Sequence, residues 1–164
     1  MLKKISIAVV ILLIGIQFIP YEKNSSNDLT YDISKSYNMP DHIQTIFTNV
    51  CNDFHSNNTA YPWYSNIEPI GFWLNDHVVD GKRHLNFSEF TKLPLAVQNH
   101  KLEETVEMVE KGEMPLADYT YLGLHAAANL TQAQRQEIID WADSQMAMLA
   151  ATYPADSLVM KKRN

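Results

Sequence analysis

The stretch CNDFHSNNTAYPWY, residues 51–64, decides how the rest of the chain can be interpreted. Just before it, apolar side chains recur at positions i, i+3, i+4 and i+7: Ile43, Ile46, Phe47 and Val50. This spacing predicts a helix that is capped by Asp41 and leads directly into Cys51. If the helix continues, Cys51 and His55 lie one turn apart on the same face.

A cysteine and a histidine at this spacing suit one kind of site in particular. A C-x-x-C-H run marks the covalent attachment of a c-type haem, and histidine is a common proximal ligand of haem iron. Here Phe54 stands where the second cysteine of that run would be. The five residues alone therefore leave two interpretations open, a haem site with one attachment point or an incidental Cys–His pair.

Three further segments show helical periodicity. Residues 70–80 carry an apolar face and end at the DGK of residues 80–82, and residues 102–111 end at Gly112. The last segment starts with a capping box formed by Thr131 and Gln134 and continues to Leu149. No stretch alternates well enough to predict a strand. The sequence thus predicts an all-α domain with long loops, behind an N-terminal hydrophobic helix.

The N-terminus indicates export. MLKK precedes an apolar run of about 15 residues, residues 5–19, which is shorter than the roughly 20 residues of a typical span. No small-residue cleavage site follows, so residues 1–20 are expected to be a signal peptide or a membrane anchor, and the bulky side chains favour the uncleaved anchor. Lys3 and Lys4 would stay cytoplasmic, which places the domain on the periplasmic side of the inner membrane or in the cell envelope. Residues 21–40 are expected to be a tether, 41–153 the domain and 154–164 a C-terminal tail.

Composition excludes several classes of protein. The formal net charge is −6, so no basic face for nucleic acid is expected. The chain has one cysteine, which cannot form an internal disulfide and makes a structural zinc site improbable.

Longer motifs carry a resemblance to a known family. The chain contains HSNNTAYPWY at residues 55–64, PIGFWLNDHVVDGKRHLNFSEF at 69–90 and GEMPLADYTYLGLHAAANLT at 112–131. In these motifs it resembles bacterial haem-binding domain proteins, whose members look like CxxCHSNNTxYPWY followed by LNFSEF and GEMP segments. The resemblance covers nearly the whole chain and implies a small cytochrome-c-like helical domain that carries haem.

The resemblance also implies site residues. His55 matches the proximal ligand of the family's C-x-x-C-H, and Met114 in GEMP is the candidate for the second iron ligand, on resemblance and chemical plausibility. Phe54 departs from the pattern. Three outcomes follow: a haem held by one thioether to Cys51, a haem held without a covalent bond, or a domain that has lost haem.

Other side chains have both a functional and an ordinary interpretation. His77 lies on the apolar face of residues 70–80 and is an alternative iron ligand or a core histidine. Three aromatic residues could line a cofactor pocket or belong to a plain core: Tyr61, Trp63 and Trp73. Lys82 and Arg83 could pair with haem propionates or occupy a solvated turn.

These observations lead to competing functions. The first is an exported haem protein that transfers electrons to an unknown redox partner and performs no substrate chemistry of its own. The second is a haem-free periplasmic interaction module that keeps the scaffold. A third, an enzyme or gas sensor with a five-coordinate haem, requires that Met114 does not bind the iron.

Overall fold

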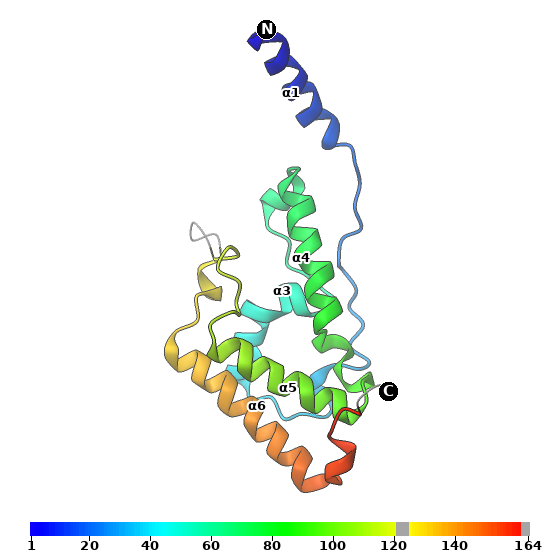
Figure 1. Ribbon diagram of the computed structural model, residues 1–164, viewed down its shortest axis with the longest axis vertical. Helices are drawn as coiled ribbons and strands as arrows, with labels where there is room; N and C mark the ends of the chain where they lie inside the picture. The colour runs from blue at the N-terminus through cyan, green and yellow to red at the C-terminus, as the bar shows by residue number, and fades with distance from the viewer. Residues whose placement is uncertain (121–124, 162–164) are drawn as a thin grey trace.

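The computed structural model describes residues 1–120 and 125–161, and these residues form an all-α fold. Over the two described ranges no strand forms, and the only extended pairing is an isolated bridge between Ser25 and Asn58. The predicted fold class is confirmed. Helix α1 (Leu2–Ile16) stands at one end of the molecule, apart from the body (Figure 1), and buries none of its side chains. Among the described helices, none has both the length and the apolar character needed to cross a bilayer.

The helical course that leads to His55 consists of three joined segments: α2 (Asp41–Ile46), the π-helical η2 (Phe47–Cys51) and α3 (Asn52–His55). The N-cap is Pro40, and Asp41 is already the first helical residue. The predicted capping role of Asp41 is therefore wrong, although its carboxylate still lies in the first turn, where the helix dipole favours negative charge.

Of two long helices after this course, the first ends where predicted but begins at Leu95, before the predicted residues 102–111, and the second begins where predicted. Helix α5 (Leu95–Glu110) ends before Gly112, whose φ of 71° lies in the left-handed region that glycine adopts most easily. Helix α6 (Gln132–Thr152) begins with the predicted capping box of Thr131 and Gln134. The two helices pack side by side (Figure 1). The loops contain short 3-10 turns: η1 (Ile33–Lys35), η3 (Trp63–Asn66), η4 (Phe87–Lys92), η6 (Ala126–Ala128) and η7 (Ala155–Ser157).

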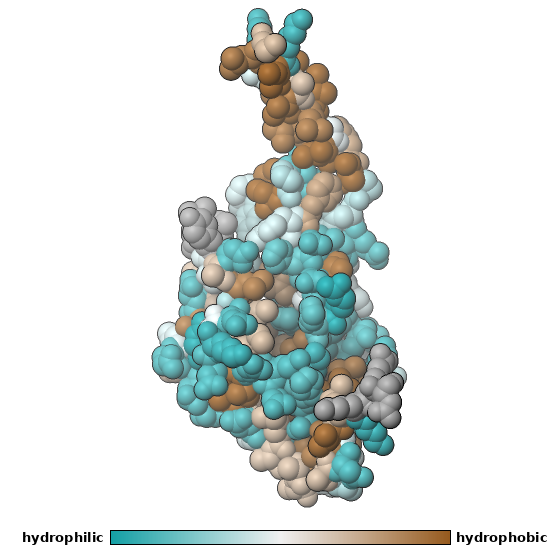
Figure 2. All heavy atoms as spheres, in the orientation of Figure 1, coloured by the Kyte–Doolittle hydropathy of each residue, from teal (hydrophilic) through white to brown (hydrophobic). Residues whose placement is uncertain are grey.

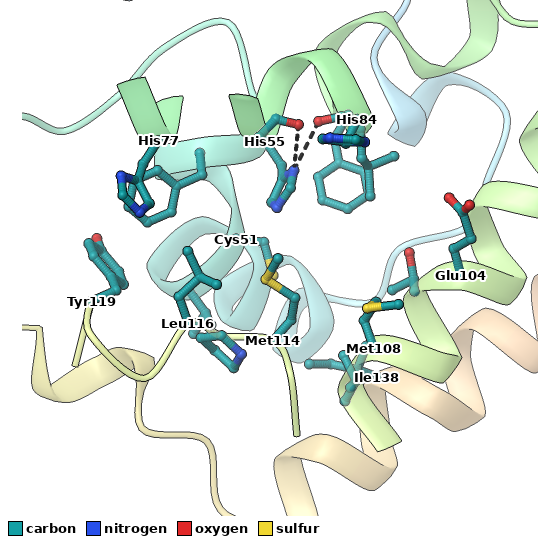
Figure 3. A pocket seen from close by; sticks show the side chains of 18 of the residues that line it. Cys51, His55, His77, His84, Glu104, Met108, Met114, Leu116, Tyr119 and Ile138 are labelled. Atoms are coloured by element: carbon teal, nitrogen blue, oxygen red, sulfur yellow. Dashed lines mark hydrogen bonds between the residues drawn. The ribbon is translucent and has the colours of Figure 1, made fainter. Parts of the chain in front are cut away.

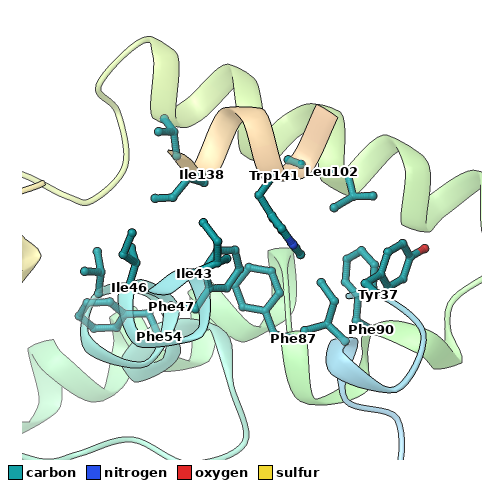
Figure 4. Close-up of a cluster of buried hydrophobic side chains, with 14 of the residues drawn as sticks. Tyr37, Ile43, Ile46, Phe47, Phe54, Phe87, Phe90, Leu102, Ile138 and Trp141 are labelled. Atoms are coloured by element: carbon teal, nitrogen blue, oxygen red, sulfur yellow. The ribbon is translucent and has the colours of Figure 1, made fainter. Parts of the chain in front are cut away.

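The core is built around aromatic rings from distant parts of the chain (Figure 4). The Phe47 ring lies 4.9 Å from the Phe87 ring and 5.0 Å from the Trp141 ring, measured between centroids. The indole N–H of Trp141 donates to the backbone carbonyl of Asn38 at 2.8 Å. The helical course to His55 is thus packed between η4 and α6, which fixes its position.

Residues 21–40, expected as a tether, lie against the body and contribute to its core. Ile33 and Tyr37 are buried, and the Tyr37 hydroxyl donates to the side-chain carbonyl of Gln98 at 2.6 Å. Burial raises the pKa of Tyr37 to about 12. The packed unit therefore begins before Asp41, because two apolar side chains of this polar segment fill space beside η4 and α5.

The SNNT motif after His55 makes hydrogen bonds to several distant segments of the chain. Asn57 accepts a hydrogen bond from the Asn86 amide at 2.8 Å, and its backbone N–H donates to Ser88 Oγ at 3.1 Å. The Asn24 amide donates to the Ser56 carbonyl at 2.9 Å. These bonds tie the segment after α3 to the LNFSEF segment and to residues 21–40. They explain how Ser56, Asn57 and Thr59 can be buried although they are polar.

Helix α4 (Ile70–His84) runs three residues beyond Gly81. The predicted end at residues 80–82 is wrong, because His84 is the last residue of the helix. Gly81 allows α4 to pack closely against α3 and does not end the helix. A Cβ at this position would lie 2.7 Å from the Phe54 carbonyl oxygen and 3.0 Å from Phe54 Cβ, so only glycine lets α4 approach α3 this closely.

The variant Gly81→Ala is expected to lower the free energy of unfolding by about 1–3 kcal/mol, because the added methyl group must push α4 away from α3. Urea unfolding followed by circular dichroism measures this. Gly15→Ala in α1 is the matched control, since nothing lies within 4 Å of its Cβ. Equal stability of Gly81→Ala and wild type would show that the contact between α3 and α4 is loose.

Candidate functional site

One cavity of about 460 Å³ lies between α3, α4, α5 and the segment that follows α5 (Figure 3). This volume is within the range of about 300–1,000 Å³ found for cofactor and small-molecule sites. Its walls are mainly apolar, with contributions from Val50, Phe54, Leu85, Phe87, Met108, Val109, Leu116, Leu130 and Ile138. The cavity also contains Cys51, His55, His77 and Met114. The structure therefore brings these four of the predicted site residues together.

His55 is held by two backbone carbonyls. Its Nδ1 lies 3.0 Å from the Leu85 oxygen and 3.1 Å from the Gly81 oxygen. Because carbonyl oxygens only accept hydrogen bonds, Nδ1 carries the proton and Nε2 keeps a free lone pair. Burial lowers the pKa of His55, which favours the neutral imidazole. The His55 ring projects into the cavity, and its second nitrogen points away from the two carbonyls (Figure 3). Metal-binding histidines have this orientation, with one ring nitrogen on a hydrogen-bond acceptor and the other facing the metal.

Met114 reaches the same cavity from the segment that follows α5. After Gly112 turns the chain, the backbone N–H groups of Glu113 and Met114 both donate to the Met108 carbonyl, at 3.0 and 3.1 Å. The guanidinium of Arg135 donates to the Met114 carbonyl at 2.9 Å. Met114 is thus fixed to α5 and to α6, and its thioether points into the cavity (Figure 3).

Cys51 and Phe54 stand on the same wall as His55. Burial raises the pKa of the Cys51 thiol to about 12, so the sulfur is protonated at neutral pH. Phe54 is buried, and its ring meets the ring of Tyr119 edge-on with 4.5 Å between centroids. The Tyr119 hydroxyl donates to Asp53 Oδ2 at 2.6 Å. An aromatic contact therefore occupies the position of the second cysteine of a C-x-x-C-H run.

His77 lines the cavity, but its ring nitrogens already have neighbours. Nδ1 lies 2.9 Å from the Trp73 carbonyl of the preceding turn of α4, and Nε2 lies 3.9 Å from Asp118 Oδ2. Of the two predicted histidine ligands, His55 is the one whose second nitrogen has no hydrogen-bond or ion-pair partner among the residues that the structure describes; His84 of α4 also lines the cavity.

Five predicted cofactor contacts do not line the cavity: Tyr61, Trp63, Trp73, Lys82 and Arg83. Lys82 donates to Asn24 Oδ1 at 2.6 Å, and Arg83 pairs with Asp80 on its own helix. Trp63 is 75% exposed. Their contact with a cofactor stays a prediction without support from the cavity.

Sequence reasoning missed several cavity residues. Glu104 and Met108 of α5 belong to the wall, as does Tyr119 beyond it. The Gly81 and Leu85 carbonyls that orient His55 are backbone groups, so no side-chain pattern could indicate them. In the described part of the chain, no three His, Cys, Asp or Glu side chains gather as they would around a bare metal ion.

Comparison with known proteins identifies the family. The haem-binding domain family matches residues 11–144, which is most of the chain, whereas no curated protein and no solved structure matches significantly. The cavity fits the cofactor that the family name implies, because it is apolar, large enough for a cofactor and supplied with a neutral histidine whose Nε2 is free. Haem is the cofactor. The chain belongs to the haem-binding domain family.

Proposed function

We propose that the protein is an exported electron carrier in which His55 Nε2 binds the haem iron. The observation that carries the proposal is the pair of hydrogen bonds from His55 Nδ1 to the Gly81 and Leu85 carbonyls. These bonds fix the tautomer, orient the ring and make Nε2 more basic. Bound haem supplies a one-electron couple at its iron. The surrounding apolar side chains exclude water from it.

Met114 is proposed as the second iron ligand. Its backbone is held by the Met108 carbonyl and by Arg135, so the thioether is presented by a fixed loop rather than by a flexible one. Methionine as a ligand raises the reduction potential of haem. With His55 and Met114 both as ligands, no position at the iron would remain open, which favours electron transfer over peroxide or gas chemistry.

Cys51 is proposed to hold the haem by one thioether. With haem bound, the thiol would add across a vinyl group: a sulfur–carbon bond would form, the vinyl double bond would become a single bond, and the thiol proton would end on the other vinyl carbon. All atoms and electrons of the thiol and the vinyl group are retained in the product, so this addition requires no oxidant. Phe54 supplies packing where a second thioether would otherwise form, since its ring lines the cavity beside Tyr119.

The proposed location is the periplasmic face of the inner membrane, with α1 as an uncleaved anchor. Its apolar side chains are exposed, and Lys3 and Lys4 lie at the end that would remain cytoplasmic. The redox partner would then be another protein of the cell envelope. A purified protein whose mass lacks the N-terminal residues would show instead that the segment is a cleaved signal peptide.

Met114→Ala tests the second ligand. The variant is expected to keep its Soret band but to lose the near-infrared band of a Met–iron bond completely and to have a lower reduction potential. Near-infrared absorption of the ferric protein measures the first effect and redox titration the second.

The matched control is Met108→Ala, which removes a second methionine that lines the same cavity and should keep the near-infrared band. Loss of the band in Met108→Ala, with the band intact in Met114→Ala, would exchange the two assignments. A wild-type protein with no Soret band, after expression in a host that makes haem, would support the haem-free interaction module.

A further inference from the structure

One end of the body presents apolar side chains and exposes no charged side chain of its own. We call residues 61–75 the tip; they comprise η3 and the start of α4. Four apolar side chains of the tip are substantially exposed: Trp63 (75%), Ile67 (44%), Ile70 (42%) and Trp73 (42%). Glu68 is the only charged residue in this range. It is 7% exposed, and its Oε2 accepts a hydrogen bond from the Phe72 N–H at 2.8 Å.

The tip is fastened to the residues that follow α1. The Gln17 side chain makes two hydrogen bonds to the backbone of Glu68, donating to its carbonyl and accepting from its N–H, each at 3.0 Å. The Tyr21 hydroxyl donates to the Ser65 carbonyl at 2.7 Å. The tip therefore lies beside the C-terminal end of α1 (Figure 1), and apolar side chains appear on α1 and again, among more polar ones, at the adjoining end of the body (Figure 2).

The length of α1 sets how deep this junction would lie. Helix α1 has 15 residues, which at 1.5 Å per residue gives about 22 Å, against a hydrocarbon core of about 30 Å. An anchor this short draws the residues at its end toward the bilayer. Because the Gln17 side chain is hydrogen-bonded to the Glu68 backbone, the tip must move toward the bilayer together with the end of α1. Tryptophan is favoured at the boundary between headgroups and acyl chains, where an amphipathic ring is stabilised.

We propose that the tip docks into the outer-leaflet boundary of the lipid bilayer beside α1, with Trp63, Ile67 and Ile70 in contact with lipid. This inference rests on the membrane anchor proposed above. The tip exposes no charged side chain of its own, although the Lys23 ammonium donates to Asn66 Oδ1 at 2.6 Å. Its apolar exposed side chains and its attachment to the end of α1 favour lipid over a second copy of the chain or another protein. Since α4 runs from the tip to the haem cavity, docking would also hold the haem at a fixed distance from the membrane surface.

Photolabelling by lipid tests the proposal. The full-length haem protein is reconstituted into vesicles of phosphatidylethanolamine and phosphatidylglycerol in equal parts, with a trace of phospholipid that carries a diazirine in the upper acyl chain. After irradiation, mass spectrometry locates the labelled residues. Labels are expected in α1 and in residues 61–75, and none are expected in α6. Unlike fluorescence, this measurement is unaffected by the absorption of haem.

The variant with Trp63→Ser, Ile67→Ser and Ile70→Ser replaces three exposed side chains, and its tip labelling is expected to fall severalfold while α1 labelling stays the same. Val79→Ser is the matched control, because Val79 is 57% exposed on α4 but lies outside the tip; its labelling pattern should equal that of wild type. Labels in α1 without labels in the tip overturn the docking and leave the anchor standing, whether water, a second copy or another protein covers the tip. Labels in neither segment overturn both.

Discussion

Replacing His55 with alanine is expected to abolish the low-spin spectrum of the haem protein and, in a chain that also carries Cys51→Ser, to lower haem affinity by more than about 100-fold. Loss of a residue that merely orients a metal ligand already costs about 10–100-fold, and His55 is proposed as the ligand itself. Absorption spectra of the ferrous and ferric protein measure the first effect. Haem titration of the double variant measures the second.

The histidine substitution has a structural cost that must be separated from the loss of ligation. His55→Ala removes the imidazole donor from the Leu85 carbonyl, whereas the Gly81 carbonyl still accepts from the Leu85 N–H at 2.9 Å. The loss should lower the free energy of unfolding by about 1–3 kcal/mol. Urea unfolding measures this cost directly. Added imidazole should restore a low-spin spectrum to a folded His55→Ala protein, because the space left by the side chain accepts it, whereas an unfolded chain could not respond.

His77→Ala is the matched control for this experiment, since His77 lines the same cavity while its Nδ1 bonds to the Trp73 carbonyl. It should retain haem and a low-spin spectrum. If His77→Ala loses the low-spin spectrum and His55→Ala keeps it, the assignment of the proximal ligand is wrong.

The sequence was most informative where a local pattern determines the structure. Apolar spacing predicts α5 and α6, and the Thr131–Gln134 capping box marks the start of α6, because both depend on residues within one or two turns. The convergence of Cys51 and His55 on one cavity wall follows from their spacing for the same reason. Met114 was placed by resemblance, and it lines the cavity because Gly112 and Arg135 direct its loop.

Contacts between distant segments could not be predicted in this way. Gly81 looks like a helix stop in the sequence, yet it lies inside α4 because Phe54 of α3 fills the space of a side chain. Ile33 and Tyr37 belong to the core although they are isolated in a polar segment with no period. Trp63 and Trp73 were expected in a cofactor pocket or a core, but composition does not distinguish those from an exposed apolar tip.

Cys51→Ser tests the most unusual feature of the chain, a haem-attachment motif with a single cysteine. In the wild-type protein, haem should remain with the polypeptide after denaturation and acidic acetone extraction, and the intact mass should equal that of the chain plus haem. In Cys51→Ser all haem should be extracted, because oxygen does not form the corresponding bond to a vinyl group under these conditions. The native spectrum should change little, since His55 still binds the iron.

Phe54→Leu is the control for this second experiment, because it removes the aromatic contact with Tyr119 but leaves the thiol in place, and its haem should resist extraction as in wild type. Phe54→Cys offers the opposite change: it supplies a second thiol one residue before His55, so both vinyl groups could be joined. Phe54 is 7% exposed, and loss of its ring should cost up to about 3–5 kcal/mol, part of which a second covalent bond would offset. If haem is extracted from the wild-type protein but stays bound to Phe54→Cys, Cys51 alone does not attach it. In that case the wild-type protein, with Phe54 in place of the second cysteine, holds haem only through His55 and packing.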